Sequence, residues 1–105
     1  MNKYRAVRTN GFASKFEAAV YHFLEIDPDV SDIKCQKKIY LTDAKILLIV
    51  DFEYLRKGKL TYGEAKGFET ASWRIKRKLW KYYGPAKLEI FAGSHARPYL
   101  KEVVG

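Results

Sequence analysis

The chain has 105 residues, of which 48% are apolar and 15% are aromatic. This length and apolar content predict one compact domain over residues 1–105 and exclude both a disordered protein and a pair of domains. The 20 Lys and Arg residues outnumber the 12 Asp and Glu residues, which gives a net charge of +8 at pH 7. Because a basic surface attracts polyanions, nucleic acid is the first partner to expect.

Cysteine, histidine and apolar patterns exclude further classes of protein. The single cysteine, Cys35, cannot form an internal disulfide, and with His22 and His95 far from it in sequence it cannot build a Cys/His zinc site. No stretch approaches the ~18 consecutive apolar residues of a membrane span, and residues 1–12 lack the apolar core of a signal peptide. We therefore expect a cytoplasmic protein, in a host cell if a phage encodes it, with no membrane contact and no small-molecule cofactor.

A first helix is predicted over residues 14–25, where apolar residues recur at helical spacing. Ser14 followed by Glu17 three positions later is typical of a capping box. The helix should end before Pro28, because the residue preceding a proline is disfavoured in the helical conformation.

Two extended segments follow the helix. Residues 33–41 are predicted to form a strand that pairs as a hairpin with a second strand over residues 46–55. The second strand begins with the uninterrupted apolar run 46–50, which favours burial on both faces and a central place in the sheet. A third strand runs from Leu60 to Gly67, and alternation along it places Glu64 and Lys66 on the same face.

Helical spacing returns over residues 70–83, with Ile75, Leu79 and Tyr82 or Tyr83 on the inner side. A right-handed crossover should then lay residues 87–92 parallel to the third strand. The order αβββαβ predicts an α/β (α+β) fold, with a mixed four-stranded sheet flanked by helices. Residues 1–13 remain as an N-terminal arm, and residues 93–105 as a tail that forms a loop, a small strand or a dimer contact.

Three charged residues in the predicted sheet suggest hydrolytic chemistry. Asp51 lies in an apolar strand, and burying an unpaired carboxylate is so unfavourable that it should face partners or a cation. Glu64 on the neighbouring strand would bring a second carboxylate within reach of the same Mg²⁺ ion. Lys66 beside them could hold the water that attacks a phosphodiester.

The order of these residues resembles the PD-(D/E)xK nuclease superfamily, whose core has the restriction-endonuclease-like αβββαβ arrangement. Within it the chain is most similar to the phage endonuclease I family of Holliday junction resolvases and to small phage endonuclease-like proteins, over roughly residues 14–92. Val50 departs from the motif, which names a proline at that position. The resemblance is carried by the segments Ser14-Lys15-Phe16-Glu17, Val50-Asp51-Phe52 and Glu64-Ala65-Lys66-Gly67, and by Thr70, Lys76 and Lys78-Leu79.

The resemblance implies a Mg²⁺-dependent endodeoxyribonuclease, with Mn²⁺ as a substitute metal. Asp51, Glu64 and the Ala65 carbonyl would bind the metal, Lys66 would position the attacking water, and Glu17 would complete the site from the first helix. It also implies a homodimer acting on branched or duplex DNA. Gln36 on the first strand resembles a position that often points toward the site. The plainer interpretations are that Glu17 only caps its helix, that the Gln36 side chain is only solvated, and that Trp73 and Trp80 belong to the core.

Basic residues in the second helix predict contacts with DNA phosphates. Between Thr70 and Tyr83 there are several cations and no acid. The predicted DNA-binding residues are Lys3, Arg5 and Arg8 in the N-terminal arm and Arg74, Lys76, Arg77, Lys78 and Lys81 in the helix. The alternative to a nuclease is a non-catalytic DNA-binding module on the same fold, and a small RNA-binding protein ranks last because exposed alternating aromatic residues are missing.

Overall fold

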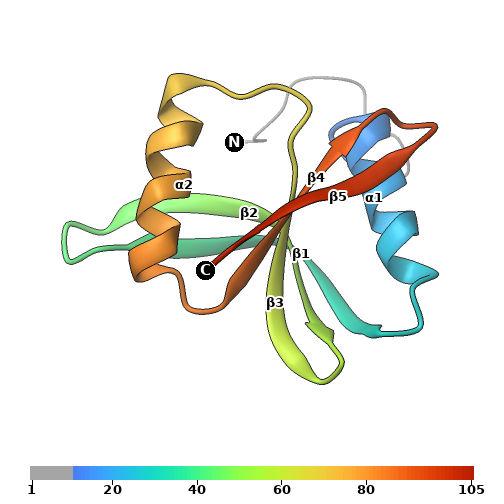
Figure 1. Cartoon of the computed structure of the whole chain (residues 1–105), viewed down its shortest axis with the longest axis horizontal. Helices are drawn as coiled ribbons and strands as arrows, with labels where there is room; N and C mark the ends of the chain where they lie inside the picture. The colour runs from blue at the N-terminus through green and yellow to red at the C-terminus, as the bar shows by residue number, and fades with distance from the viewer. Residues whose placement is uncertain (1–10) are drawn as a thin grey trace.

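The computed structural model describes residues 11–105 and shows two helices with one five-stranded mixed sheet (Figure 1). The α+β class is confirmed, but the sheet has one strand more than the four expected. The elements in chain order are α1 (Lys15–Glu25), β1 (Val30–Leu41), β2 (Ile46–Arg56), β3 (Lys59–Ala65), α2 (Ala71–Tyr83), β4 (Lys87–Gly93) and β5 (Pro98–Val104). In residues 11–105 no helix is long and apolar enough to cross a membrane.

Both helices begin at a side-chain cap, and the cap at Ser14 is the one that the sequence predicts. The Ser14 side chain accepts a hydrogen bond from the Glu17 backbone N–H at 3.0 Å, and Thr70 does the same for the N–H of Trp73 at 3.1 Å. Each cap satisfies one of the backbone donors that a helix leaves unpaired at its first turn. The cap residues thereby fix where α1 and α2 start.

The strands lie in the order β1-β2-β3-β4-β5. All neighbouring pairs are antiparallel except β3 and β4, which are parallel, as the crossover through α2 predicts. The fifth strand comes from the tail, and Leu88 in β4 pairs with Val104 in β5. A small strand was one of the three forms expected for residues 93–105, and the buried Val104 makes this strand part of the core.

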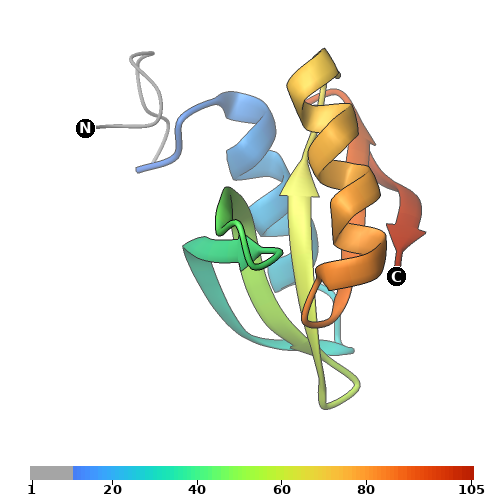
Figure 2. The same ribbon diagram turned by 90° about the vertical axis from the view of Figure 1, so that its left-hand side faces the viewer.

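The helices cover opposite faces of the sheet, so the protein has three layers (Figure 2). On one face, Trp73 and Trp80 of α2 pack with residues of the strands that include Tyr62 and Ile90. On the other, Val20 and Leu24 of α1 pack with Phe52, Tyr54 and Phe91. Two separate apolar clusters therefore hold the sheet from its two sides.

The inner face of α2 differs in part from the one predicted. Leu79 packs against the core as expected, and the expectation that Trp73 and Trp80 belong to the core is confirmed. Ile75 and Tyr82 are 61% and 76% exposed, whereas Trp73 and Trp80, two turns apart, are buried. The sequence offers two apolar stripes along this helix, and the one with the larger buried area faces the sheet, since burial of an indole removes more apolar surface from water. Trp80 also donates a 2.8 Å hydrogen bond from Nε1 to the Ala86 carbonyl.

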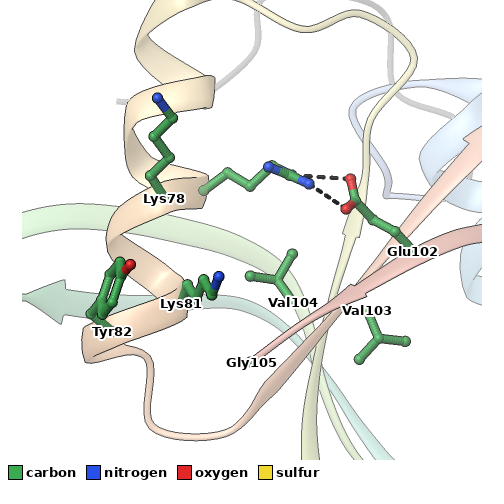
Figure 3. A pocket seen from close by; sticks show the side chains of 8 residues that line it. Lys78, Lys81, Tyr82, Glu102, Val103, Val104 and Gly105 are labelled. Carbon is green, nitrogen blue, oxygen red and sulfur yellow. Dashed lines mark hydrogen bonds and ion pairs between the residues drawn. The ribbon is translucent and has the colours of Figure 1, made fainter.

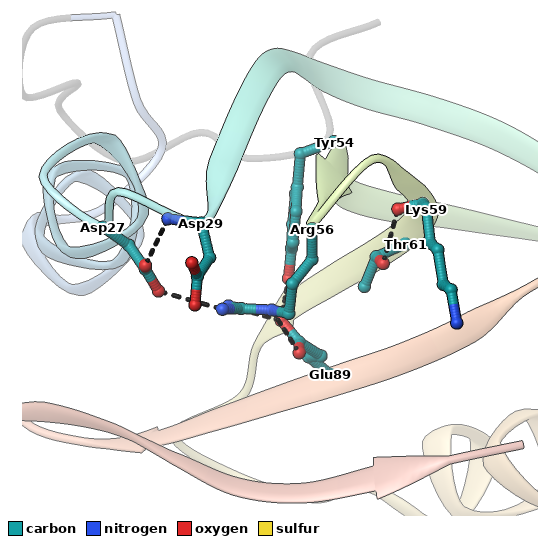
Figure 4. Close-up of polar contacts among 7 residues, drawn as sticks. All are labelled: Asp27, Asp29, Tyr54, Arg56, Lys59, Thr61 and Glu89. Atoms are coloured by element: carbon teal, nitrogen blue, oxygen red, sulfur yellow. Dashed lines mark hydrogen bonds and ion pairs between the residues drawn. The ribbon is translucent and has the colours of Figure 1, made fainter.

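A buried polar network ties the end of α1 to two strands (Figure 4). Arg56 Nε lies 2.7 Å from Glu89 Oε2, and Arg56 Nη1 lies 2.9 Å from Asp27 Oδ2. The Tyr54 hydroxyl donates a 2.6 Å hydrogen bond to Glu89 Oε1, and burial together with this contact raises the pKa of Tyr54. Gly63 leaves the room that the Tyr54 ring needs, because a Cβ there would lie 2.8 Å from the tyrosine oxygen.

Candidate active site

Asp51 of β2 and Glu64 of β3 lie side by side in the sheet. The register pairs Phe52 with Gly63, which places the two acids at the next opposed positions. Their side chains are almost completely buried, and the Asp51 backbone N–H donates a 3.0 Å hydrogen bond to Glu64 Oε1. The structure thus brings together the two carboxylates that the sequence predicts to be neighbours.

Asp51 occupies the point where β2 passes from one apolar cluster to the other. Leu48 and Val50 belong to the cluster under α2, whereas Phe52 and Tyr54 belong to the cluster under α1. The apolar residues of β2 therefore pack first against one cluster and then against the other. The Asp51 carboxylate lies between the two clusters, where Gln36 and the backbone N–H of Ala65 contact it.

Lys66 lies beside Glu64, as the alternation along the third strand predicts. Its Nζ is 3.3 Å from Glu64 Oε2 and 4.5 Å from the centroid of the Trp73 ring. An ammonium over an indole face is attracted by the negative face of the ring, which restricts where the amine can go. Ala65, between the two charged residues, donates its backbone N–H to Asp51 Oδ2 at 3.0 Å.

Glu17 and Gln36 bring two further elements to the same place. Gln36 Nε2 on β1 lies 3.3 Å from Glu17 Oε2 on α1 and 3.5 Å from Asp51 Oδ1. Glu17 is buried, and its carboxylate contacts Gln36. Its backbone N–H donates to the Ser14 cap, so Glu17 takes part in the capped first turn of α1 and also lies in the polar cluster.

Gln36 is the residue whose role the sequence leaves undecided. Its backbone has a φ of 56°, a left-handed conformation that is uncommon for residues other than glycine, asparagine and aspartate. This conformation inside a strand goes with a side chain that bridges Glu17 and Asp51. The sequence shows a polar residue at position 36 of a predicted strand, but it does not predict the left-handed backbone conformation of that residue.

The cluster carries negative potential into its surroundings. The pKa of the nearby Cys35 thiol is raised, first by burial and then by the carboxylates of Glu17 and Asp51. The second of these causes is electrostatic, because carboxylates disfavour a thiolate nearby. Among the described residues, Lys66 brings a positive charge to the cluster through its ion pair with Glu64.

The donors present suit a hard divalent cation. Asp51, Glu64 and the Ala65 carbonyl offer only oxygen atoms, which Mg²⁺ prefers. Within residues 11–105 no group of three or more His, Cys, Asp or Glu side chains is placed to hold a metal ion together. Two carboxylates are nevertheless enough protein ligands for Mg²⁺, because this ion is commonly bound by one or two carboxylates, with water and substrate phosphate as its other ligands.

The predicted DNA-binding residues of α2 differ in how they are engaged. Arg77 forms a two-pronged ion pair with Glu102 of β5, and Arg74 Nε lies 3.8 Å from Glu69 Oε1. Lys78 and Lys81 make no ion pair with any described residue and line a cavity of about 460 Å³ between α2 and β5 (Figure 3). The arm residues Lys3, Arg5 and Arg8 lie outside the described part of the chain.

Sequence comparisons add no relative to this picture. No protein-family model matches the chain, and no curated protein is significantly similar to it.

Proposed function

We propose that the protein is a metal-dependent endonuclease that hydrolyses phosphodiester bonds in DNA. The observation that carries the proposal is the buried cluster in which Asp51 and Glu64 lie together with Lys66 held at 3.3 Å from Glu64. Two buried carboxylates and an amine are unfavourable to fold around unless they do chemistry or bind a cation. The cationic surface of α2 next to this cluster is suited to a polyanionic substrate.

In this proposal Asp51, Glu64 and the Ala65 carbonyl would hold Mg²⁺ or Mn²⁺, which would neutralise charge on the phosphodiester and make a water more acidic. Lys66 donates hydrogen bonds to the attacking water and stabilises the negative charge that develops on the phosphate oxygens. Attack forms a bond from the water oxygen to phosphorus and breaks one phosphorus–oxygen bond. The attacking water gives up one proton to solvent, and the leaving oxygen takes one proton from solvent. Glu17 acts through Gln36, which positions the Asp51 carboxylate.

The preferred substrate in this proposal is branched DNA, such as a Holliday junction. The domain is small, and the cations of α2 recognise phosphates, which carry no base sequence. Specificity then has to come from the shape of the DNA. The resemblance to the endonuclease I resolvases supports branched DNA as that shape, and it supports a homodimer as the active species.

Strand cleavage tests the proposal. Labelled four-way junction, linear duplex and single strand are incubated with the full chain in Mg²⁺, in Mn²⁺ and in EDTA. We expect nicks in the junction with either metal and none in EDTA. Tight DNA binding without nicks in any metal would replace the nuclease with the non-catalytic DNA-binding module.

A further inference from the structure

A cleft beside the candidate active site is lined mostly by residues that have no role in the proposed metal site. It has a volume of about 280 Å³ and lies between the start of α2 and the apolar run of β2. Glu64 and Lys66 form the part that it shares with the cluster. The remaining lining residues are Leu47, Leu48, Ile49, Thr70, Ser72, Trp73 and Lys76.

Lys76 gives the cleft a positive charge that no described residue neutralises. Its side chain is half-buried, and it forms no ion pair within residues 11–105. Arg77, the next residue, is paired with Glu102, and Arg74 lies close to Glu69. Lys76 is thus a cation inside a cleft rather than one on an open helix face, and its charge is available to an anion that enters the cleft.

The indole of Trp73 provides a second sign of a missing partner. Trp73 is 4% exposed, and its Nε1–H has no hydrogen-bond acceptor among the described residues. A buried N–H without an acceptor costs about 1–3 kcal/mol, and such groups are rare in folded proteins. The matched case is Trp80 on the same helix, whose Nε1 donates to the Ala86 carbonyl.

Lys76 and the indole N–H of Trp73 thus line the cleft without a partner among the described residues, and Glu64, paired with Lys66, is the one acid in the lining. Hydroxyl groups of Thr70 and Ser72 stand at the start of α2, and the first turn of this helix contains no acidic residue. The N-terminal end of a helix favours an anion. Two lysines, hydroxyl groups and an indole N–H can donate hydrogen bonds to phosphate oxygens. These features agree in calling for an anion next to Lys66.

We propose that this cleft is a subsite for one backbone phosphate of DNA, the one adjacent to the phosphate at Lys66, with Lys76 as its main anion-binding residue. The inference rests on the proposed nuclease function for what lies at Lys66. The proposal gives Lys76 a different role from the exposed cations of α2. The exposed cations attract the DNA backbone without fixing its position, whereas Lys76 and Trp73 fix the register of the DNA strand at the cluster.

The two tryptophan residues of the chain give a direct probe, because their indole N–H groups produce two signals in a ¹H–¹⁵N spectrum. Trp73→Phe identifies which signal is which. The full chain in EDTA is titrated with a short DNA duplex, and separately with inorganic phosphate, while fluorescence anisotropy follows saturation with DNA. We expect the Trp73 signal to shift with DNA while that of Trp80 stays in place, and phosphate to give the same shift only at far higher concentration.

Lys76→Gln and Lys78→Gln make a matched pair, since both remove one positive charge from the same helix. Both should reduce the salt dependence of binding by about one phosphate contact. Only Lys76→Gln should abolish the shift of the Trp73 signal at saturating DNA, and Lys76→Arg should keep it. A Trp73 signal that does not move in the wild type, that moves equally in both Gln variants, or that responds to inorganic phosphate but not to DNA would overturn the subsite.

The same samples keep the two proposals apart when Mg²⁺ is added. A Trp73 shift that depends on Lys76, in a protein that never nicks DNA, would sustain the subsite and refute the nuclease. Nicking by a protein whose Trp73 signal ignores DNA would refute the subsite and leave the nuclease.

Discussion

The backbone N–H of Asp51 donates a 3.0 Å hydrogen bond to the carboxylate of Glu64 on the neighbouring strand, and both side chains are at most 2% exposed. One acid thus helps to fix the other, which keeps two carboxylates in the interior of the sheet. Lys66, at 3.3 Å from Glu64, completes an arrangement in which charge is buried only together with partners.

The affinity for DNA should depend steeply on salt, because cations of α2 replace counterions along the phosphates. The double variant Lys78→Gln/Lys81→Gln should reduce the slope of log K against log salt concentration by about 1.8, at about 0.9 for each lost contact. Arg77→Gln should change it less, since Arg77 is already paired with Glu102. Anisotropy titrations over a series of salt concentrations measure the slopes, and equal effects of all three substitutions would show that the Glu102 pair does not restrain Arg77.

The network around Glu89 should contribute strongly to the stability of the fold. Arg56→Met leaves a buried carboxylate without its cation and should lower the free energy of unfolding by about 3–5 kcal/mol. Tyr54→Phe removes one hydrogen bond to the same carboxylate and should cost about 1.5–3 kcal/mol. Urea unfolding measures both, with Lys59→Met on the same hairpin as the control. Wild-type stability in Arg56→Met would refute this account of the network.

Stability should fall in mild acid, partly through Glu102. Its hydrogen bond with Arg77 holds the pKa of Glu102 below the ordinary value of 4.5, so this carboxyl releases its proton more readily in the folded chain. The stabilisation is complete above the unfolded pKa and is lost as the pH falls through the lower folded pKa. Thermal unfolding of wild type and Glu102→Gln from pH 6 to pH 3 measures it, and the difference in Tm should shrink toward low pH. A difference that is independent of pH would show that the pair contributes nothing through ionisation.

The active species should be a homodimer, because cutting both strands of a junction symmetrically needs two sites related by a two-fold axis. Exposed apolar residues are available for an interface on β5, where Tyr99, Leu100 and Val103 face solvent, and on α2 at Ile75 and Tyr82. Sedimentation velocity at micromolar concentration, with and without a four-way junction, measures the mass. A protein that stays monomeric in both conditions and makes only single nicks would exclude a resolvase while leaving a nuclease.

Local signals in the sequence predict most of the fold. The capping box at Ser14 places the start of α1, and the crossover through α2 makes β3 and β4 parallel. The sequence leaves the fifth strand as one of three forms for the tail, because its pairing with β4 depends on contacts made only after the sheet exists. The inner face of α2 is predicted only in part for a similar reason, since two apolar stripes compete and only the sheet decides between them.

In the candidate site, too, local patterns predict some features, whereas others depend on the packed structure. Alternation along β3 predicts that Glu64 and Lys66 lie together, and the hairpin predicts that Asp51 lies next to Glu64. Gln36 could not be assigned, because its left-handed backbone conformation has no sequence signal. The unpaired Nε1 of Trp73 was equally invisible, since a buried donor without an acceptor is a property of the packed structure alone.

The central claim is that Asp51, Glu64 and Lys66 form a metal-dependent catalytic site, and single-turnover nicking of a four-way junction in Mg²⁺ tests it most directly. Asp51→Asn and Lys66→Met should each reduce the nicking rate by about 100-fold or more, because each removes charge that stabilises the transition state. Asp43→Asn and Lys59→Met make the same changes at exposed positions and should nick at the wild-type rate. All four variants should bind the junction in EDTA with affinities close to that of the wild type. Nicking at the wild-type rate by folded Asp51→Asn and Lys66→Met proteins would contradict the site.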